Sequence, residues 1–428
     1  MRFSRWLVAG ALLFSGTVWS APPEAPVRQD ITVAADGSGD FRTIQAALES
    51  LPRSNSERKI ILIKDGLYKE KIRVDASCVT LRGQSRQGTR IEFAQLEDDF
   101  QKQKDDLGRA VINLNKANDV VIENLTAANT ATNITAHAIT IFGTGDRTVL
   151  LNCDLLSEGA DTVALWRTPK GRYYFAGCHF RGASDYVCPR GWCYATNCTF
   201  FGTKKGGSAT WHDGSNDPDK KFVLRNCKFD GVEGWNLSRH LVDSELYYLD
   251  CSFSKTLADK APFRVVYRND PKKTAEVNSE ILWGERFYYH NCHRDGGAYA
   301  WHQDNLASAA NSVAPEEITP AWTFAGEWDP ERKSPPSIQQ VAAQGPRITV
   351  TFDEPVSVRG KPRLLLKTGP ADYVNGGGTE TLVFNAPNGK AGEAQALDPN
   401  GATILACQAG IALRVANLAL PAAPDKPR

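Results

Sequence analysis

A strand-like unit recurs through the middle of the chain, and this repeat constrains the fold more than any other feature. Six copies carry a cysteine within an alternating apolar stretch, as in LLNCDLL, YFAGCHF and YLDCSF. These cysteines, spaced 20 to 41 residues apart, are Cys153, Cys178, Cys198, Cys227, Cys251 and Cys292. Units that recur at such spacings predict a stacked array, because each unit buries its apolar face against its neighbours.

The composition of the units and of the segments between them indicates the kind of array. The units alternate as β-strands do, and the short linkers hold the Gly, Asp, Asn and Ser that turns require. Parallel coils of this kind predict an all-β fold, a right-handed parallel β-helix, in which aligned side chains stack at about 4.8 Å per coil. Small cysteines suit its interior, so we interpret most of them as packing residues. A disulfide between Cys178 and Cys198, about one coil apart, is the alternative for that pair.

The open end of such a β-helix must be covered. Residues 43–51 predict a short capping helix, and Pro52 would stop it. Its apolar residues at positions i, i+3, i+4 and i+7 would share one face: Ile44, Ala47, Leu48 and Leu51. We expect this helix to be structural.

The first twenty residues have the pattern of a secretory signal peptide. Arg2 and Arg5 precede an apolar run over residues 6–14, and small residues follow up to Ser20. The run is too short to cross about 30 Å of hydrocarbon as a membrane anchor. We therefore expect residues 1–20 to be removed and the mature protein to be secreted or periplasmic, without a membrane span.

The charge of the chain limits its partners only weakly. A formal net charge of +1 and a pI near 7.5 disfavour a polyanion-binding surface over the whole molecule, although a local basic cleft stays open. We expect no nucleic-acid partner. A capped β-helix with a near-neutral surface is compatible with a monomer, which is our expectation.

The character of the chain changes after the repeat. Residues 330–337 read as a linker, and residues 338–428 hold short apolar strands separated by Gly and Pro turns. This pattern predicts a small β-sandwich domain that resembles the Ig-like modules of exported bacterial proteins. Surface tethering, sugar binding and passive linkage all remain open for it.

Several segments together resemble one family, the pectin methylesterases. The chain opens on ITVAADGSGDFRTIQAAL and ILIKDGLYKEKIRV, continues through GADTVALW, GASDYV and WNLSRH, and reaches GGAYAWHQDNL and ITPAWTFAGEWDP. The similarity spans residues 30–329, in the same order as in a divergent bacterial-type member. It implies a parallel β-helix enzyme without metal or other cofactor, which hydrolyses methyl esters of galacturonate in pectin and releases methanol.

The same resemblance implies the catalytic residues. The family's two aspartates fall on Asp161 in GADTV and Asp185 in GASDY, and its arginine falls on Arg239 in NLSRH. The aspartates are 24 residues apart (185 − 161), about one coil, so their carboxyls should stand side by side. Two adjacent carboxyls repel when both are charged, which raises one pKa and leaves the other group ionised. By resemblance, Asp185 is the nucleophile, Asp161 the general acid and then base, and Arg239 orients Asp185.

The chain departs from the family pattern around this trio. The family's two oxyanion-binding glutamines fall on His137 and Ala160, and alanine cannot donate. His137 is a candidate replacement, with a capping role at the end of a strand as the equal alternative. Candidate contacts to the substrate are Arg190 and four tryptophans, for each of which core packing is the alternative: Trp166, Trp192, Trp211 and Trp235.

Three readings of the function follow from these observations. The first is pectin methyl ester hydrolysis, and the second is the same ester chemistry on a different esterified glycan. The third is a β-helix that binds cell-wall polysaccharide but lacks turnover because the two glutamines are replaced. A lyase is disfavoured because no cluster of acidic residues suited to calcium stands out. The methylation pattern of the substrate and processivity are not determined by the sequence.

Overall fold

The structure is a computed structural model of the chain. It describes residues 31–406 except 54, 56–57, 168–169, 213–216, 266–268, 273–281, 311–312, 333–335 and 390. The predicted signal peptide, residues 1–20, and the end of the predicted C-terminal domain lie outside the described residues. Within these ranges no helix is long and apolar enough to cross a membrane.

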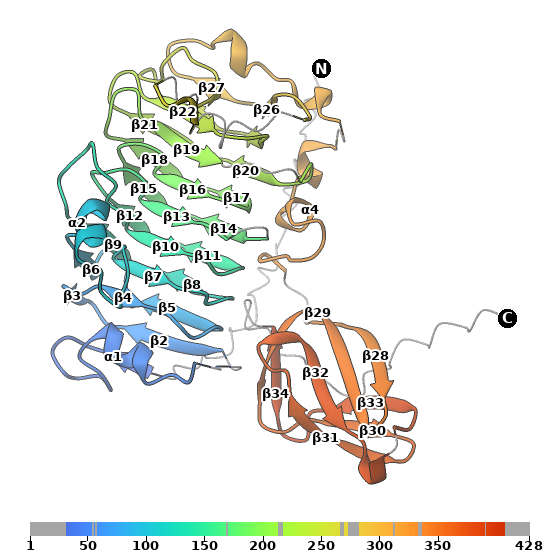
Figure 1. The fold of residues 1–428 in the computed structure, drawn as a ribbon. Helices are drawn as coiled ribbons and strands as arrows, with labels where there is room; N and C mark the ends of the chain where they lie inside the picture. The colour runs from blue at the N-terminus through green and yellow to red at the C-terminus, as the bar shows by residue number, and fades with distance from the viewer. Residues whose placement is uncertain are drawn as a thin grey trace, which may run out of the picture.

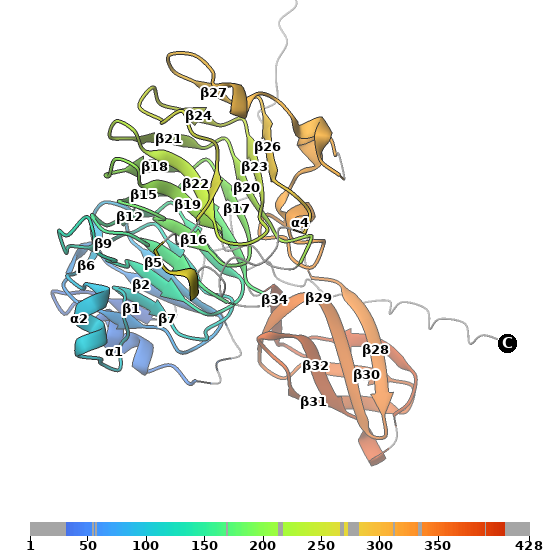
Figure 2. The same ribbon diagram turned by 45° about the horizontal axis from the view of Figure 1, so that its top comes forward.

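Three parallel sheets wind around one core and form the predicted β-helix (Figures 1 and 2). In the described chain, the ten-stranded sheet runs β1 (Ile31–Val33), β2 (Lys59–Ile63), β5 (Val79–Gly83), β8 (Val121–Glu123), β11 (Thr148–Leu151), β14 (Arg172–Ala176), β17 (Trp192–Thr196), β20 (Lys221–Arg225), β23 (Glu245–Leu249) and β26 (Arg286–His290). The nine-stranded sheet runs β3 (Gly66–Tyr68), β6 (Thr89–Phe93), β9 (Thr126–Asn129), β12 (Asp154–Leu156), β15 (His179–Gly182), β18 (Thr199–Gly202), β21 (Lys228–Gly231), β24 (Ser252–Phe253) and β27 (His293–Arg294).

The eight-stranded sheet completes each coil, and the predicted catalytic aspartates lie next to its strands. It runs β4 (Ile72–Arg73), β7 (Ile112–Leu114), β10 (Ile141–Gly143), β13 (Val163–Leu165), β16 (Val187–Pro189), β19 (Ser208–His212), β22 (Asn236–His240) and β25 (Phe263–Arg264). Every pairing in the three sheets is between strands of successive coils. Equivalent residues of the repeat therefore stand above one another, as the sequence period predicts.

The core consists of columns of like side chains. Phe180, Phe200, Phe229 and Phe253 occupy matching positions on four successive strands of the nine-stranded sheet, and all are buried. The rings of Phe200 and Phe229 stack with their centroids 4.3 Å apart. Such columns continue the core from coil to coil without a central hydrophobic nucleus.

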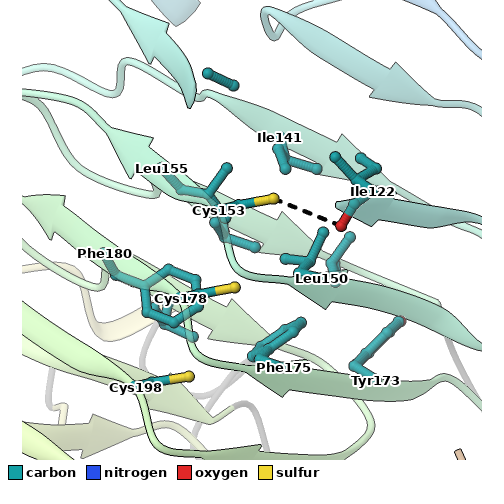
Figure 3. Packing of buried hydrophobic residues seen from close by; sticks show 14 of the residues in the cluster. Ile122, Ile141, Leu150, Cys153, Leu155, Tyr173, Phe175, Cys178, Phe180 and Cys198 are labelled. Atoms are coloured by element: carbon teal, nitrogen blue, oxygen red, sulfur yellow. Dashed lines mark hydrogen bonds between the residues drawn. The ribbon is translucent and has the colours of Figure 1, made fainter. Parts of the chain in front are cut away.

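The six repeated cysteines form another interior column, part of which Figure 3 shows. Their thiols are free, so the predicted disulfide between Cys178 and Cys198 is not formed. Side chains at matching positions of parallel strands point the same way at the strand spacing of about 4.8 Å, whereas a disulfide requires Cβ atoms about 3.8 Å apart. Each thiol instead donates to a backbone carbonyl, Cys178 to Ala176 at 3.6 Å and Cys198 to Thr196 at 3.2 Å.

A ladder of turn residues lies directly before the cysteine column. The residue that precedes each cysteine has a left-handed backbone, with φ between 48° and 65°: Asn152, Gly177, Asn197, Asn226, Asp250 and Asn291. Several side chains hydrogen-bond along the stack, with Asn226 Nδ2 donating to Asn197 Oδ1 at 2.5 Å and Asn291 Nδ2 to Asp250 Oδ1 at 2.8 Å. Asparagine tolerates this backbone region better than most residues, so each coil turns at the same place.

The N-terminal capping helix is confirmed. Helix α1 (Ile44–Glu49) begins at Thr43, whose hydroxyl accepts from Ala46 N, and Ile44, Ala47 and Leu48 are buried against the first coils. The Glu70 carboxylate accepts the free N–H groups of Ile44 and Gln45 at 2.9 and 3.0 Å. The helix ends two residues before the predicted Leu51, because Ser50 already caps its last turn.

Two further segments cover the outside of the β-helix. Helix α2 (Glu97–Lys102) follows β6. After β27, the chain forms short helices η1 (Ala300–His302), η2 (Leu306–Ser308), η3 (Pro315–Glu317) and α4 (Pro320–Thr323). Buried residues of this return segment, among them Ile318, Phe324 and Trp328, share a cluster with the outer face of the ten-stranded sheet.

The C-terminal part forms a separate antiparallel β domain, as predicted (Figure 1). Its elements are β28 (Ile338–Gln344), β29 (Arg347–Arg359), β30 (Arg363–Leu366), β31 (Gly369–Asn375), β32 (Thr379–Asn385), η4 (Pro387–Gly389), β33 (Ala394–Asp398) and β34 (Thr403–Ala406). The long strand β29 pairs with β28 and β32 in its first half and with β34 in its second half. The domain has its own core, and its likeness to Ig modules stays a prediction.

Candidate active site

The predicted aspartates lie on neighbouring coils at the outer face of the eight-stranded sheet. Asp161 precedes β13 and Asp185 precedes β16, and both have left-handed backbones with φ of 61° and 51°. The main chain holds this turn, because Asp161 N donates to Ser184 O at 3.1 Å and Asp185 N to Ser208 O at 2.6 Å. Non-glycine residues in such conformations cluster at functional sites, where the surrounding fold stabilises them.

Arg239 reaches Asp185 from β22, two strands beyond β16 in the sheet. Its Nε donates to Asp185 Oδ1 at 2.8 Å, and its Nη2 donates to Asp185 Oδ2. The guanidinium also lies 5.0 Å from the ring of Trp211, which is its register neighbour on β19. A two-pronged arginine contact of this kind fixes the orientation of the carboxylate as well as its charge.

The two carboxyls differ in their protonation. Burial, followed by the negative charge of Asp185, raises the pKa of Asp161 to about 8. Burial also raises the pKa of Asp185, but the hydrogen bonds and charge of Arg239 oppose that rise. At neutral pH the geometry therefore favours a protonated Asp161 beside an ionised Asp185.

His137 lies at the edge of this pair. Its Nε2 is 3.7 Å from Asp161 Oδ2, and its side chain is 56% exposed. The residue forms a parallel bridge with Ala160, and its carbonyl accepts the N–H of Glu97 at 2.9 Å. The imidazole is thus within reach of a substrate, whereas Ala160 has no side-chain donor and its backbone N–H already donates to Ala136 O at 2.9 Å.

Arg190 and Trp166 lie beside Asp161 on the same face. The Arg190 guanidinium is 4.0 Å from the Trp166 ring, and its positive charge opposes the rise in the pKa of Asp161. Trp166 Nε1 donates to Cys188 Sγ at 3.3 Å, which fixes the indole across two strands. Among the four candidate tryptophans, Trp166 and Trp211 are the two that lie at the site.

The other two tryptophans lie elsewhere, and their predicted contacts to substrate are wrong for this site. Trp235 is 1% exposed and stacks on Phe229 in the core, so no polysaccharide reaches its face. Trp192 belongs to β17 of the ten-stranded sheet, where its indole donates to Asp219 O at 3.0 Å. The inward or outward direction of each indole follows from strand register, which the sequence motifs did not reveal.

Three residues of this face were not predicted from the sequence to lie at the site: Glu97, Arg109 and Phe142. Glu97 begins α2, and its charge adds to the rise in the pKa of Asp161. Arg109 Nη1 lies 3.0 Å from Glu97 Oε1, and its guanidinium is 4.9 Å from the Phe142 ring. Strand register is the feature that places Phe142 at the site. Phe142 on β10 pairs with Ala164 on β13, the strand that follows Asp161.

The described residues hold no group of three or more His, Cys, Asp or Glu side chains placed to bind a metal ion. The distinctive chemistry of this face is a buried carboxyl pair with one arginine. A family model described as pectinesterase matches residues 30–255.

The chain belongs to the pectinesterase family. A pectinesterase of Petunia integrifolia is 28% identical over 47% of this chain and 54% of that protein. Pectinesterase 4 of Arabidopsis thaliana is 26% identical over 68% of this chain and 49% of that protein. The chain therefore spans about half the length of these curated relatives of the pectinesterase family.

Solved pectin methylesterases share the fold of this pectinesterase-family chain. A pectin methylesterase in complex with a hexasaccharide matches with a TM-score of 0.57 and 18% identity, over 72% of this chain and 99% of that chain. The enzyme from Erwinia chrysanthemi matches with a TM-score of 0.56 and 18% identity, over 71% and 98%. These structures confirm the predicted parallel β-helix.

Proposed function

We propose that this protein hydrolyses methyl esters of galacturonate in pectin and releases methanol. The observation that carries the proposal is the carboxyl pair, in which Arg239 binds Asp185 while Asp161 has a pKa of about 8. An ionised nucleophile beside a protonated acid is what ester cleavage without metal requires. Family membership and the named relatives support pectin as the substrate, and a secreted or periplasmic location follows from the predicted signal peptide.

The reaction proceeds in two steps on these residues. An Asp185 carboxylate oxygen attacks the ester carbonyl carbon, and Asp161 gives its proton to the departing methoxide, which leaves as methanol. The resulting anhydride joins Asp185 to the uronate. Asp161, now ionised, takes a proton from water, whose oxygen attacks the uronate carbonyl. The carbonyl carbon's bond to Asp185 breaks, which restores the Asp185 carboxylate and releases a galacturonic acid group that ionises in solvent. Arg239 acts as the positioning residue that holds Asp185 in line.

The oxyanion of the tetrahedral intermediate needs a donor near the pair. We propose His137 for this role, because its Nε2 lies 3.7 Å from Asp161 Oδ2 and its side chain is open to solvent. We also propose Arg190, whose charge acts on Asp161 and which lies against Trp166, as a contact to a uronate carboxylate or to the oxyanion. A donor in such a position contributes about 3–4 kcal/mol to transition-state stabilisation.

Replacement of the nucleophile tests the proposal. Asp185→Asn keeps the size of the side chain but removes its charge, so methanol release from methylated pectin should fall by about a thousandfold or more. Asp230→Asn, an exposed change on β21 of the nine-stranded sheet, is the matched control and should leave the rate unchanged.

Each other outcome selects a different function. Methanol release that persists in Asp185→Asn would contradict the assigned nucleophile. Acetate release from acetylated glycans, with methylated pectin untouched, would favour an esterase with another glycan as substrate. Binding of pectin without release of methanol or acetate would favour a polysaccharide-binding β-helix.

His137 has a separate test. His137→Ala should lower kcat on methylated pectin by more than about tenfold if the imidazole stabilises the oxyanion. His137→Gln, which restores an amide donor, should recover part of that loss. An unchanged kcat in His137→Ala would assign the residue to a purely structural role at the end of its strand.

A further inference from the structure

The second half of strand β29 contributes to the contact between the C-terminal domain and the β-helix. The first half alternates between buried residues and residues that are exposed or partly exposed, whereas residues 354–358 are buried without a break. Val356 and Val358 pack in the core of the domain, and Ser357 Oγ accepts the N–H of Arg58 from the β-helix at 2.6 Å. Both faces of this half are therefore covered, one of them by the β-helix.

Glu354 is the acidic residue of this buried stretch. It is 7% exposed, and among the described residues its Oε1 accepts no hydrogen bond. Arg332 Nη1 lies 3.6 Å from that oxygen but donates to Asp353 Oδ2 at 2.5 Å, so the arginine binds Asp353 more closely. The N–H of Ser337 also donates to Asp353, at 2.8 Å. A negative charge on Glu354 is therefore only partly compensated, which is costly in a buried position.

Charged groups from three segments of the chain face Glu354. Residues 329–332, strand β29 and the segment before β8 supply them: Arg332, Asp329, Asp353 and Asp119. Asp119 of the β-helix already receives Nε and Nη2 of Arg147, at 2.7 and 2.8 Å. Burial raises the pKa of Glu354 to about 7, and the three carboxylates add to that rise against the attraction of the arginine in residues 329–332.

Separation of the domain from the β-helix would reverse this shift. Glu354 would then regain solvent and lose the nearby charge of Asp119, so its pKa would fall toward the ordinary value of 4.5. Between about pH 4.5 and 7 the docked form thus holds a proton that the separated form releases. This contribution to docking is fully present below about pH 4.5, and it is lost as the pH rises through 7.

We propose that the contact between the β-helix and the C-terminal domain is a pH-sensitive switch with Glu354 as its titrating group. In acid, Glu354 is neutral and the domain docks on the β-helix through β29. At neutral and alkaline pH, the ionised Glu354 adds a negative charge beside Asp353 and Asp119, and the docked form loses population. The switch acts on the arrangement of the two domains and involves no residue of the catalytic carboxyl pair.

Trypsin cleavage of the full chain after Arg332 measures the separated population. Arg332 is held by Asp353 and Glu354, so the protease reaches it when the contact opens, and the rate follows the open fraction. Glu354→Gln keeps the shape of the side chain but stays neutral. At pH 8 this variant should be cut about tenfold to a hundredfold more slowly than wild type, and at pH 5 the two rates should lie within about fourfold. Comparison at equal pH removes the pH dependence of trypsin itself.

Asp329→Asn tests the charges that come from outside the domain. It removes one of the carboxylates that face Glu354, so cleavage at pH 8 should slow by about twofold to fivefold. Each rate is divided by that of a peptide of residues 325–337 with the same substitution. Glu393→Gln is the matched control, because Glu393 is an exposed carboxylate of the same domain that pairs with Lys367. Its rates should match wild type at both pH values.

The variants also define the results that would overturn the switch. Cleavage of Glu354→Gln at the wild-type rate or faster at pH 8 would show that an ionised Glu354 does not weaken the contact. If circular dichroism shows that Glu354→Gln is unfolded, Asp329→Asn decides alone, and a wild-type rate at pH 8 overturns the proposal.

Discussion

Asp161 and Asp185 hold equivalent positions on adjacent coils, yet their neighbours give them different properties. Arg239 contacts Asp185 with two nitrogens, whereas the charge that most affects the pKa of Asp161 is that of the Asp185 carboxylate itself. Both groups are buried, so an uncompensated charge is costly at either one. The arginine therefore decides which carboxyl ionises first, and in the proposed mechanism this one side chain distinguishes the nucleophile from the acid.

Protonation of Asp161 has a consequence for stability. Its folded pKa of about 8 exceeds the ordinary value of 3.8, so the folded state binds a proton that the unfolded state releases at neutral pH. The contribution of Asp161 to the free energy of unfolding is fully present below about pH 4, and it is lost as the pH rises through 8.

Asp161→Asn removes this pH-dependent cost. We expect the variant to raise the free energy of unfolding at pH 7 by on the order of 1–3 kcal/mol, with a gain that shrinks toward pH 4. Urea unfolding across pH 4–8 measures the effect, and Asp230→Asn is the control. A variant that is less stable at pH 7, or whose gain is the same at pH 4, would show that Asp161 is ionised in the folded protein.

At the scale of the element, each coil is built from a left-handed turn residue followed by a buried cysteine or an equivalent apolar residue. Asn152, Asn197 and Asn226 supply the turn in three coils, but Gly177 stands in the same place in the coil between Asn152 and Asn197. Gly177 has a φ of 65°, and a Cβ built there meets only the backbone of Asn152 at 3.9 Å. The ladder of amides is interrupted at this coil.

The Gly177→Asn substitution should make the ladder of side-chain amides continuous through this coil. Asparagine accepts the left-handed backbone, fits the open space and adds an amide between two others, so we expect a gain of about 0.5–1 kcal/mol in unfolding free energy. Thermal unfolding measures it. Gly177→Ala is the matched control and should be less stable than wild type by roughly 1 kcal/mol, because alanine gains no hydrogen bond and is strained at this φ. Equal melting temperatures for the two variants would show that the side-chain amides of the ladder do not stabilise the fold.

At the scale of the whole molecule, two β domains with separate cores are joined through few contacts. The N–H of Arg58 donates to Ser357 Oγ at 2.6 Å, and Arg332 Nη1 pairs with Asp353 at 2.5 Å. Every residue assigned to the carboxyl pair and its surroundings belongs to the β-helix. In the proposed mechanism, the described residues of the C-terminal domain therefore supply no reacting group.

Removal of residues 337–428 should leave hydrolysis intact. We expect kcat/KM on soluble methylated pectin to stay within about twofold of the full chain, since the β-helix keeps its own core and caps. A loss of activity in a truncated protein whose circular dichroism still shows the β-helix would assign the domain a role in catalysis. Calorimetry of the full chain should show two transitions, and a single cooperative one would contradict the independence of the domains.

The sequence by itself determined the architecture and the family. A recurring apolar strand, turn residues between the copies and the 3.6-residue pattern at Ile44, Ala47 and Leu48 are local features, so the coils and their cap were readable without coordinates. The motifs around Asp161, Asp185 and Arg239 also stand in an order that identifies the family.

Tertiary structure alone decided which side chains meet. Arg239 contacts Asp185 across 54 residues of sequence, Trp235 packs in the core while Trp211 packs against Arg239, and Cys178 and Cys198 stack as free thiols. The column that joins Phe142 to the carboxyl pair likewise depends on register between coils. A shift of one residue in register would reverse every inward and outward direction, and that register is set by stacking of the coils rather than by any local motif.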